Sequence, residues 1–215
     1  MDVLLSEYLG DFADGLWITA QLTAVSFALA VAIGMVLATC RISPIAPLRA
    51  FASVYVEIFR NVPLVALVLL VVYGLPETGI FLDFLPSVII AMTLVGSAFA
   101  CETIRTGINT VGAGQVEAAR SIGMTFGPII RDVVAPQAVR SMISPFVTLF
   151  IGILLSSSLA AVVGLRELTA TVSYINNREA LGLTTFMIAA ALYAAISLSA
   201  AWLGSRAERR WQVQR

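Results

Sequence analysis

The chain has 215 residues, of which 59% are hydrophobic and only 12% are charged, and its mean hydropathy is +0.94. Soluble domains carry about 25% charged residues. This composition therefore excludes an ordinary soluble domain and predicts an all-α protein with several membrane-spanning helices. The formal net charge is zero, which gives no electrostatic reason to expect a nucleic-acid partner.

The residue types also limit the chemistry of the chain. All 13 cations are arginine, because the sequence has neither lysine nor histidine. The absence of histidine and the isolated positions of Cys40 and Cys101 argue against a metal site. A Walker A string, GxxxxGK[ST], is impossible without lysine. We therefore expect no metal, no cofactor and no catalytic residue in this chain.

Five apolar windows predict about five transmembrane helices in one domain, residues 1–215. They lie at 16–40, 54–75, 86–104, 146–163 and 184–203. The second window is the most interrupted, since Glu57, Arg60, Asn61 and Pro63 stand at its start. We expect it to cross nevertheless, with its charged start at the level of the lipid headgroups.

The arginines are distributed unevenly between the two sides of these helices. Eleven fall on one side: Arg41, Arg49, Arg60, Arg105, Arg120, Arg131, Arg140, Arg206, Arg209, Arg210 and Arg215. The other side has only Arg166 and Arg178, each beside a glutamate, together with an acidic N-terminus that includes Asp2. Because arginine-rich loops stay in the cytoplasm, we expect the N-terminus outside and the C-terminus inside. An odd number of crossings agrees with that orientation.

The segment 106–144 is too polar to span a membrane and lacks the composition of a flexible linker. Within it, Gln115 to Met124 has the spacing of a short helix, packed through Val116, Ala119 and Ile122, which Gly127 and Pro128 are expected to end. A short, partly apolar helix of this kind either lies on the membrane or docks into a groove of a soluble partner.

The string GQVEAARSIGMTFGPIIRDVVAPQAVRSMISP, residues 114–145, resembles the cytoplasmic loop of ATP-binding-cassette (ABC) importer permeases. Their pattern is EAA, three residues, Gly, nine residues, and then Ile-x-Leu-Pro. This chain has Glu117, Ala118 and Ala119, followed by Gly123 and Pro136 at the same spacing. Ala135 replaces the usual leucine and Val133 the usual isoleucine.

The resemblance extends to the permeases of polar amino-acid importers over about residues 15–203. YVEIFRNVPL at 55–64 is similar to the segment that opens their second helix, and SAFACETIRTGI at 97–108 to the end of their third. GQVEAA and PQA complete the set. The resemblance implies a type I ABC importer permease fold in the bacterial plasma membrane, and the overall likeness points to glutamate-type systems.

The family also implies partners. An ATPase dimer binds ATP and Mg²⁺ and receives the EAA helix in a cleft, a second permease completes the path, and an external binding protein delivers the substrate. Coupling would fall to Gly114, Gln115, Glu117, Ala118, Ala119, Gly123 and Pro136. Glu117 either caps the helix start, accepts hydrogen bonds from the ATPase, or is a solvated acid.

The candidates for the substrate path are polar residues inside or beside the predicted helices. Ser156, Ser157 and Ser158 lie in LSSSL, where the family commonly reads KDTSL. They either contact substrate or bond to the backbone and a neighbouring helix. Because lysine and aspartate are missing there, we expect a homologous but different permease, rather than an identical copy, to supply most of the site.

Three further candidates have structural alternatives. Glu102 and Arg105 share one helical face, so they form an internal pair or gate the inward opening. Arg60, beside Asn61, either lies in the path or anchors the chain to membrane lipid. The small residues Gly96, Ser97, Ala98 and Ala100 suit a close helix contact or a dimer seam.

Two other functions remain compatible with the sequence. An ion-coupled secondary carrier needs coupling carboxylates within the membrane, for which only Glu102 is a candidate. A scaffold without transport activity would use the 106–144 loop to dock a partner.

Overall fold

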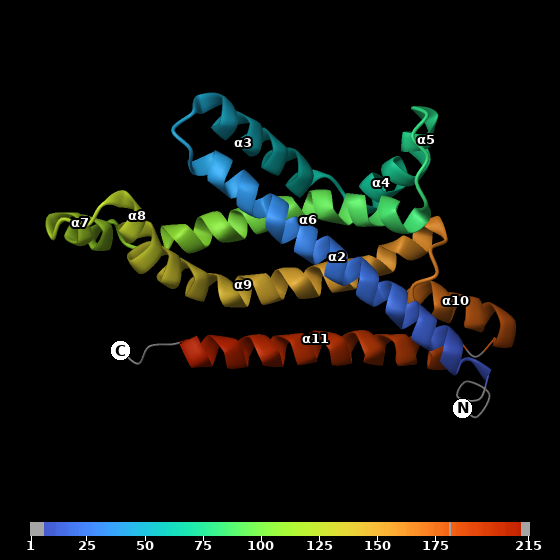
Figure 1. Ribbon diagram of the computed structural model, residues 1–215. Coiled ribbons are helices and arrows are strands. Elements are labelled where there is room, and N and C mark those ends of the chain that lie inside the picture. The colour runs from blue at the N-terminus through green and yellow to red at the C-terminus, as the bar shows by residue number, and fades with distance from the viewer. Residues whose placement is uncertain (1–6, 181, 212–215) are drawn as a thin grey trace.

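The structure is a computed structural model that describes residues 7–180 and 182–211, and every regular element in these ranges is helical (Figure 1). Asp2 and Arg215, which belong to the predicted charge asymmetry, lie outside the described residues. The elements are α2 (Leu9–Ile42), α3 (Ala46–Asn61), α4 (Leu64–Leu69), the π-helix η1 (Leu70–Gly74), α5 (Leu75–Glu77), α6 (Phe84–Asn109), α7 (Ala113–Ser121), α8 (Phe126–Pro128), the π-helix η2 (Ile129–Val134), α9 (Ala135–Ser156), the 3-10 helix η3 (Ser157–Val163), α10 (Leu168–Glu179) and α11 (Leu183–Trp211).

Four helical segments are long and apolar enough to cross a membrane. They are Leu9–Ile42, Phe84–Asn109, Phe126–Val163 and Leu183–Arg210, and the bent pair Ala46–Asn61 and Leu64–Glu77 provides a fifth crossing if it is one span. The number of spans agrees with the prediction. Most spans are longer than their apolar windows, because the helices continue through the polar residues at their ends.

The second span is broken, which the predicted continuous window 54–75 did not anticipate. Its two halves meet at 102°. Val62 and Pro63 are extended, with ψ of 129° and 126°. Proline lacks the amide hydrogen that a helix interior needs, and it forces the preceding residue out of the helical region. The pair Val62 and Pro63 therefore ends α3 and starts α4.

The polar segment between the third and fourth spans is shorter than the predicted 106–144. The helix α6 runs on to Asn109, and a new helix begins at Phe126. The expected short helix is α7, but Gly127 and Pro128 do not end it. They lie in the first turn of the next helix, where proline needs no amide hydrogen.

The helix α10 was not predicted. It begins after Glu167, whose carboxylate accepts hydrogen bonds from the backbone N–H groups of Thr169 and Ala170 at 2.9 and 2.8 Å. This is an N-cap arrangement. In Figure 1, α10 lies beside the start of α2, at the end of the molecule opposite to α7.

Close packing of α2 on α6 forms the centre of the bundle. A Cβ atom added to Gly34 would lie 2.5 Å from the Cβ of Ala100, and one added to Gly96 would lie 2.9 Å from the Cβ of Ala30. The small residues Gly96 and Ala100 therefore form a helix contact within this chain. Ser97 serves the same region, because its hydroxyl lies 2.8 Å from that of Tyr55 on α3.

The arginines that the sequence places on one side of the membrane gather at one end of the molecule. The C-terminal ends of α2, α6 and α11 gather with α7 at one end of the molecule, whereas the N-terminus and α10 lie at the other (Figure 1). We call the first the arginine-rich end, since Arg41, Arg105, Arg120 and Arg206 stand there.

Candidate functional site

A left-handed glycine ends α7 at the arginine-rich end. Gly123 has φ of 87°, a conformation that other residues adopt only with strain. Its N–H donates to the carbonyl of Arg120 at 2.9 Å, and the N–H of Met124 donates to that of Ala119 at 3.1 Å. This is a Schellman motif, and it explains why the glycine of the EAA pattern follows Ala119 at a fixed distance.

Most of the predicted coupling residues face outward on α7. Gly114, Gln115, Glu117 and Ala118 are exposed, whereas Ala119 is buried against Ile129 and Val134 of η2. The capping hypothesis for Glu117 is wrong, because Gly112 is the N-cap and Glu117 is the fifth residue of the helix. Glu117 is exposed, and within the described residues its carboxylate has no hydrogen-bond or ion-pair partner.

Two large apolar side chains flank the Gly123 turn and face solvent. Ile122 is 77% exposed and Phe126 is 74% exposed. The sequence suggested that Ile122 packs inside with Ala119, but the left-handed turn directs the chain away after Ser121. An exposed apolar pair on a polar loop is typical of a surface that a partner covers.

The helix α7 is tied to the long helix that follows it. The side-chain amide of Gln137 donates to the side-chain oxygen of Gln115, and also to the carbonyl of Val133 at 2.8 Å. Pro136 stands beside Gln137 in the first turn of α9. Gln115 and Gln137 therefore connect α7 to the first turn of α9.

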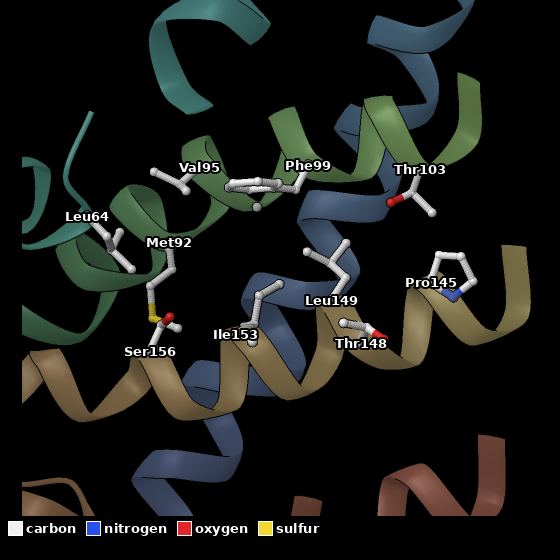
Figure 2. Close-up of a pocket in the computed structure, with 12 residues that line it drawn as sticks. Leu64, Met92, Val95, Phe99, Thr103, Pro145, Thr148, Leu149, Ile153 and Ser156 are labelled. Carbon is white, nitrogen blue, oxygen red and sulfur yellow. The ribbon is translucent and has the colours of Figure 1, made fainter. Parts of the chain in front are cut away.

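The same helix α9 lines a cavity of about 460 Å³ against α6. Figure 2 shows Phe99 and Met92 of α6 facing Leu149, Ile153 and Ser156 of α9. Ten of the twelve lining residues are labelled there, and the whole lining is Leu64, Met92, Val95, Gly96, Phe99, Thr103, Pro145, Thr148, Leu149, Gly152, Ile153 and Ser156. Its polar side chains are three hydroxyls and it contains no charge.

The three predicted serines have different surroundings. Ser156 lines the cavity. Ser157 is buried and donates to the carbonyl of Leu154, and Ser158 donates to that of Leu155, both at 2.7 Å. This bonding to the preceding turn matches the structural alternative for Ser157 and Ser158, and Ser156 is the member of the run that lines the cavity.

A smaller hollow of about 240 Å³ continues the cavity toward the arginine-rich end. The two share Phe99, Thr103 and Pro145. The smaller one adds Glu102 and the hydroxyl groups of Thr106, Thr110 and Ser141. The face between α6 and α9 thus changes from apolar to polar along its length.

Three arginines from three helices surround Glu102. Arg41 of α2 bonds its Oε1 atom, and Arg60 of α3 lies 3.5 Å from the same atom. Arg105 bonds its Oε2 atom through Nε at 3.2 Å and Nη2 at 2.9 Å. The predicted internal pair is confirmed, but it is half of a larger cluster with two excess positive charges.

The cluster also changes the interpretation of Arg60. Its guanidinium stacks 5.5 Å from the centroid of the Phe99 ring and lies 3.5 Å from Glu102. The side chain is still 42% exposed, so the lipid-anchor hypothesis stays a prediction. Asn61 instead donates to the carbonyl of Glu57 at 2.7 Å and stays exposed at the end of α3. Sequence spacing could find the Glu102–Arg105 pair, but not Arg41, which is 61 residues away.

At the opposite end, Glu167 is fully buried. Besides the two backbone N–H groups that it caps, it accepts a hydrogen bond from the hydroxyl of Tyr193 on α11 at 2.7 Å. Burial raises the pKa of Glu167 above its ordinary value, although these hydrogen bonds oppose the shift. The residue joins α10 to α11, and no motif in the sequence indicated it.

This chain shares its architecture with known membrane proteins. Residues 30–213 match the family described as binding-protein-dependent transport system inner membrane component. The chain is 35% identical to a probable glutamine ABC transporter permease protein of Bacillus subtilis, with 95% of each chain covered. It is 34% identical to a glutamate/aspartate import permease protein of Escherichia coli O6:H1, with 92% of each covered. A chain in the crystal structure of an amino acid ABC transporter with histidines superposes with a TM-score of 0.90 at 33% identity, with 96% of each chain covered.

Proposed function

Because the chain belongs to the family of binding-protein-dependent transport system inner membrane components, we propose that it forms half of the path by which an ABC importer takes up a polar amino acid. The chain is a permease subunit, and ATP hydrolysis belongs to separate ATPase subunits. The observation that carries the proposal is the connection between an exposed loop and a cavity. The helix that follows the EAA loop is the same helix that lines the space between α6 and α9.

The coupling surface consists of α7 and the two apolar side chains beside Gly123. An ATPase dimer, which binds ATP and Mg²⁺, would cover Ile122 and Phe126 and contact the exposed carboxylate of Glu117. When the two ATPases close, α7 moves with them, and the bond between Gln115 and Gln137 carries that motion into α9. The cavity then opens alternately to the two sides of the membrane.

The second permease is a homologous but different chain. The cavity of this subunit offers a polar amino acid three hydroxyl groups and no charge to pair with its ammonium or carboxylate. A partner whose own cavity carries charged residues would supply that recognition. The complex would lie in the bacterial plasma membrane. An external binding protein would deliver the substrate at the end where α10 lies.

Uptake by the reconstituted complex tests the function. We expect ATP-dependent accumulation of one or more of glutamine, glutamate, aspartate and arginine when the chain is combined with its ATPase, second permease and binding protein. Accumulation that follows an ion gradient and persists with an inactive ATPase would instead indicate a secondary carrier. A complex that binds the ATPase but transports none of these amino acids would favour a scaffold.

A substitution on the coupling surface tests how the ATPase is held. Ile122→Asp places a charge where an apolar contact is proposed, so the ATPase should no longer co-purify. Ile80→Asp is the matched control, because Ile80 is also an exposed isoleucine but lies in the loop before α6, at the other end of the molecule. Equal loss of the ATPase in both variants would contradict this assignment.

A double substitution tests whether the second permease supplies most of the substrate site. Leu155→Lys combined with Ser156→Asp restores the charges that the family commonly has in this run. Ser156 lines the cavity, whereas its neighbour Leu155 is half exposed and lies outside the lining. The new aspartate is therefore placed in the cavity and the new lysine beside it. Gain of substrate binding by this subunit supports that role of the second permease, and loss of uptake without new binding counts against it.

A further inference from the structure

A third hollow lies on a different side of α9. This groove has a volume of about 560 Å³ and shares no lining residue with the cavity of Figure 2. Buried residues of α6 and α9, among them Ile104 and Met142, form its floor. Exposed apolar side chains form its walls, including Met35 and Ile42 on α2 and Val139 on α9.

Every side chain that lines the groove is apolar. The lining comes from α2, α6 and the helix Phe126–Val163, all of which are apolar and long enough to span the membrane. A groove of this kind opens toward hydrocarbon rather than water, and an unfilled one would forfeit the dispersion contacts of its lining atoms. The occupant that the bilayer itself supplies is an acyl chain.

Positive charge borders the groove at the arginine-rich end. Arg140 is exposed, directly follows Val139, and precedes Ile143 by three residues, so it lies beside that lining residue on the helix surface. Within the described residues it has no ion-pair or hydrogen-bond partner. Arg131 follows the lining residue Ile130 and is 88% exposed, with Asp132 at 3.6 Å.

We propose that this groove is a binding site for an anionic phospholipid. One acyl chain fills the space between α2 and α9, and the headgroup phosphate accepts hydrogen bonds from the guanidinium of Arg140, with Arg131 adding to the local positive potential. Arginine suits this role because its aliphatic stem packs on apolar surface while its planar head binds phosphate in a bidentate manner. The lipid would also contact η2, the segment that links the Gly123 turn to α9.

Native mass spectrometry of the assembled transporter tests the site. The complex is transferred from mixed micelles of phosphatidylglycerol and phosphatidylcholine with identical acyl chains, and the retained lipids are counted. We expect preferential retention of phosphatidylglycerol. Arg140→Gln should weaken that preference about fivefold, the usual effect of one arginine near an anionic headgroup, while Met35→Trp should fill the groove and reduce retention of both lipids.

Matched variants separate this site from general effects. Arg206→Gln removes a charge from the same end but on α11, and Met187→Trp enlarges an exposed methionine of α11 that does not line the groove. Both should retain lipid as the wild type does. Equal retention of the two lipids by the wild type, or equal effects of Arg140→Gln and Arg206→Gln, would overturn the proposal. Unchanged retention in Met35→Trp would show that another protein segment covers the groove, and would overturn it as well.

Discussion

Glu102 compensates one of three arginines that meet inside the bundle. Its carboxylate is only 16% exposed and binds side chains from α2, α3 and α6. Arg41 is 19% exposed, whereas Arg60 and Arg105 are 42% and 40% exposed. Without this acid, three like charges would lie close together with only partial screening by solvent. Through Arg60, Glu102 therefore connects the C-terminal end of α3, where the second span bends, to the central helix α6.

Replacement of Glu102 should destabilise the fold. We expect Glu102→Gln to lower the free energy of unfolding by about 1–2 kcal/mol, because the three arginines lose their common partner while solvent screens the two that are partly exposed. For a chain of this size, that corresponds to a fall in Tm of roughly 2–8 °C. Thermal unfolding in detergent measures it. Glu57→Gln, at an exposed acid of α3, should leave Tm nearly unchanged, and similar losses in both variants would contradict the assigned role.

Glu167 predicts a dependence of stability on pH. Because its pKa is raised in the folded protein, the folded state holds a proton that the unfolded state releases, and stability falls as pH rises from about 4.5 through the raised pKa. We expect Tm to decrease over this window in the wild type and to change less in Glu167→Gln, which is neutral throughout. Glu77→Gln, at an exposed acid, should keep the wild-type slope. Identical slopes in all three proteins would refute the linkage.

At the residue scale, the sequence predicts what local spacing determines. Glu102 and Arg105 are three residues apart on one helix, so their pairing follows from helical geometry. Arg41 and Arg60 join them through the packing of α2 and α3, which spacing does not reveal. Glu167 was likewise missed, because its partner Tyr193 comes from another helix.

Among the elements, α7 depends on its left-handed glycine. A Cβ atom at Gly123 meets no other atom within 4 Å, so the cost of a substitution comes from its positive φ and not from crowding. The two hydrogen bonds of the Schellman motif fix the direction in which Ile122 and Phe126 leave the helix. The shape of the proposed ATPase contact is therefore set by one backbone conformation.

Gly123→Ala should impair coupling more than folding. The left-handed conformation costs a residue with a side chain about 1–2 kcal/mol, which favours other geometries of the exposed loop. We expect ATP-dependent uptake to fall several-fold while Tm shifts by only a few degrees. Gly127→Ala is the control, since Gly127 has ordinary helical dihedrals and open space around it. If both variants transport equally well, the turn does not govern coupling.

The sequence predicts the helices correctly where an apolar window is long and uninterrupted. The windows 16–40, 86–104, 146–163 and 184–203 all lie within helices of the structure. The break at Val62 and Pro63 was not predicted, because charged residues nearby appeared to explain the interruption. The helix α10 was missed because its sequence is too polar for a span, and its position is fixed by the buried cap at Glu167.

For the whole molecule, charge and topology agree. The arginine-rich ends of α2, α6 and α11 meet at one end of the bundle, and α10 lies at the other (Figure 1). The number of crossings and the fold class follow from the sequence, since each span must satisfy its own backbone groups. The position of the cavity does not follow from the sequence, because it depends on how α6 and α9 pack against each other.

Labelling in intact cells checks the orientation. In a background with Cys40→Ala and Cys101→Ala, Asn177→Cys on α10 should react with a membrane-impermeant maleimide, whereas Gln115→Cys on α7 should react only after the membrane is broken. Both positions are exposed, so accessibility of the side chain itself is matched. The reverse pattern would place the arginine-rich end outside.

The helical segment Phe126–Val163 has 38 residues, or about 57 Å at 1.5 Å per residue. It therefore reaches well beyond a hydrocarbon core of about 30 Å, and Pro145 stands near its midpoint. In the proposed transport cycle, we expect this segment to tilt about a point inside the membrane. A tilt that draws the Phe126 end toward the molecular centre would carry the Ser156 end away from it, which would close one end of the proposed path while opening the other.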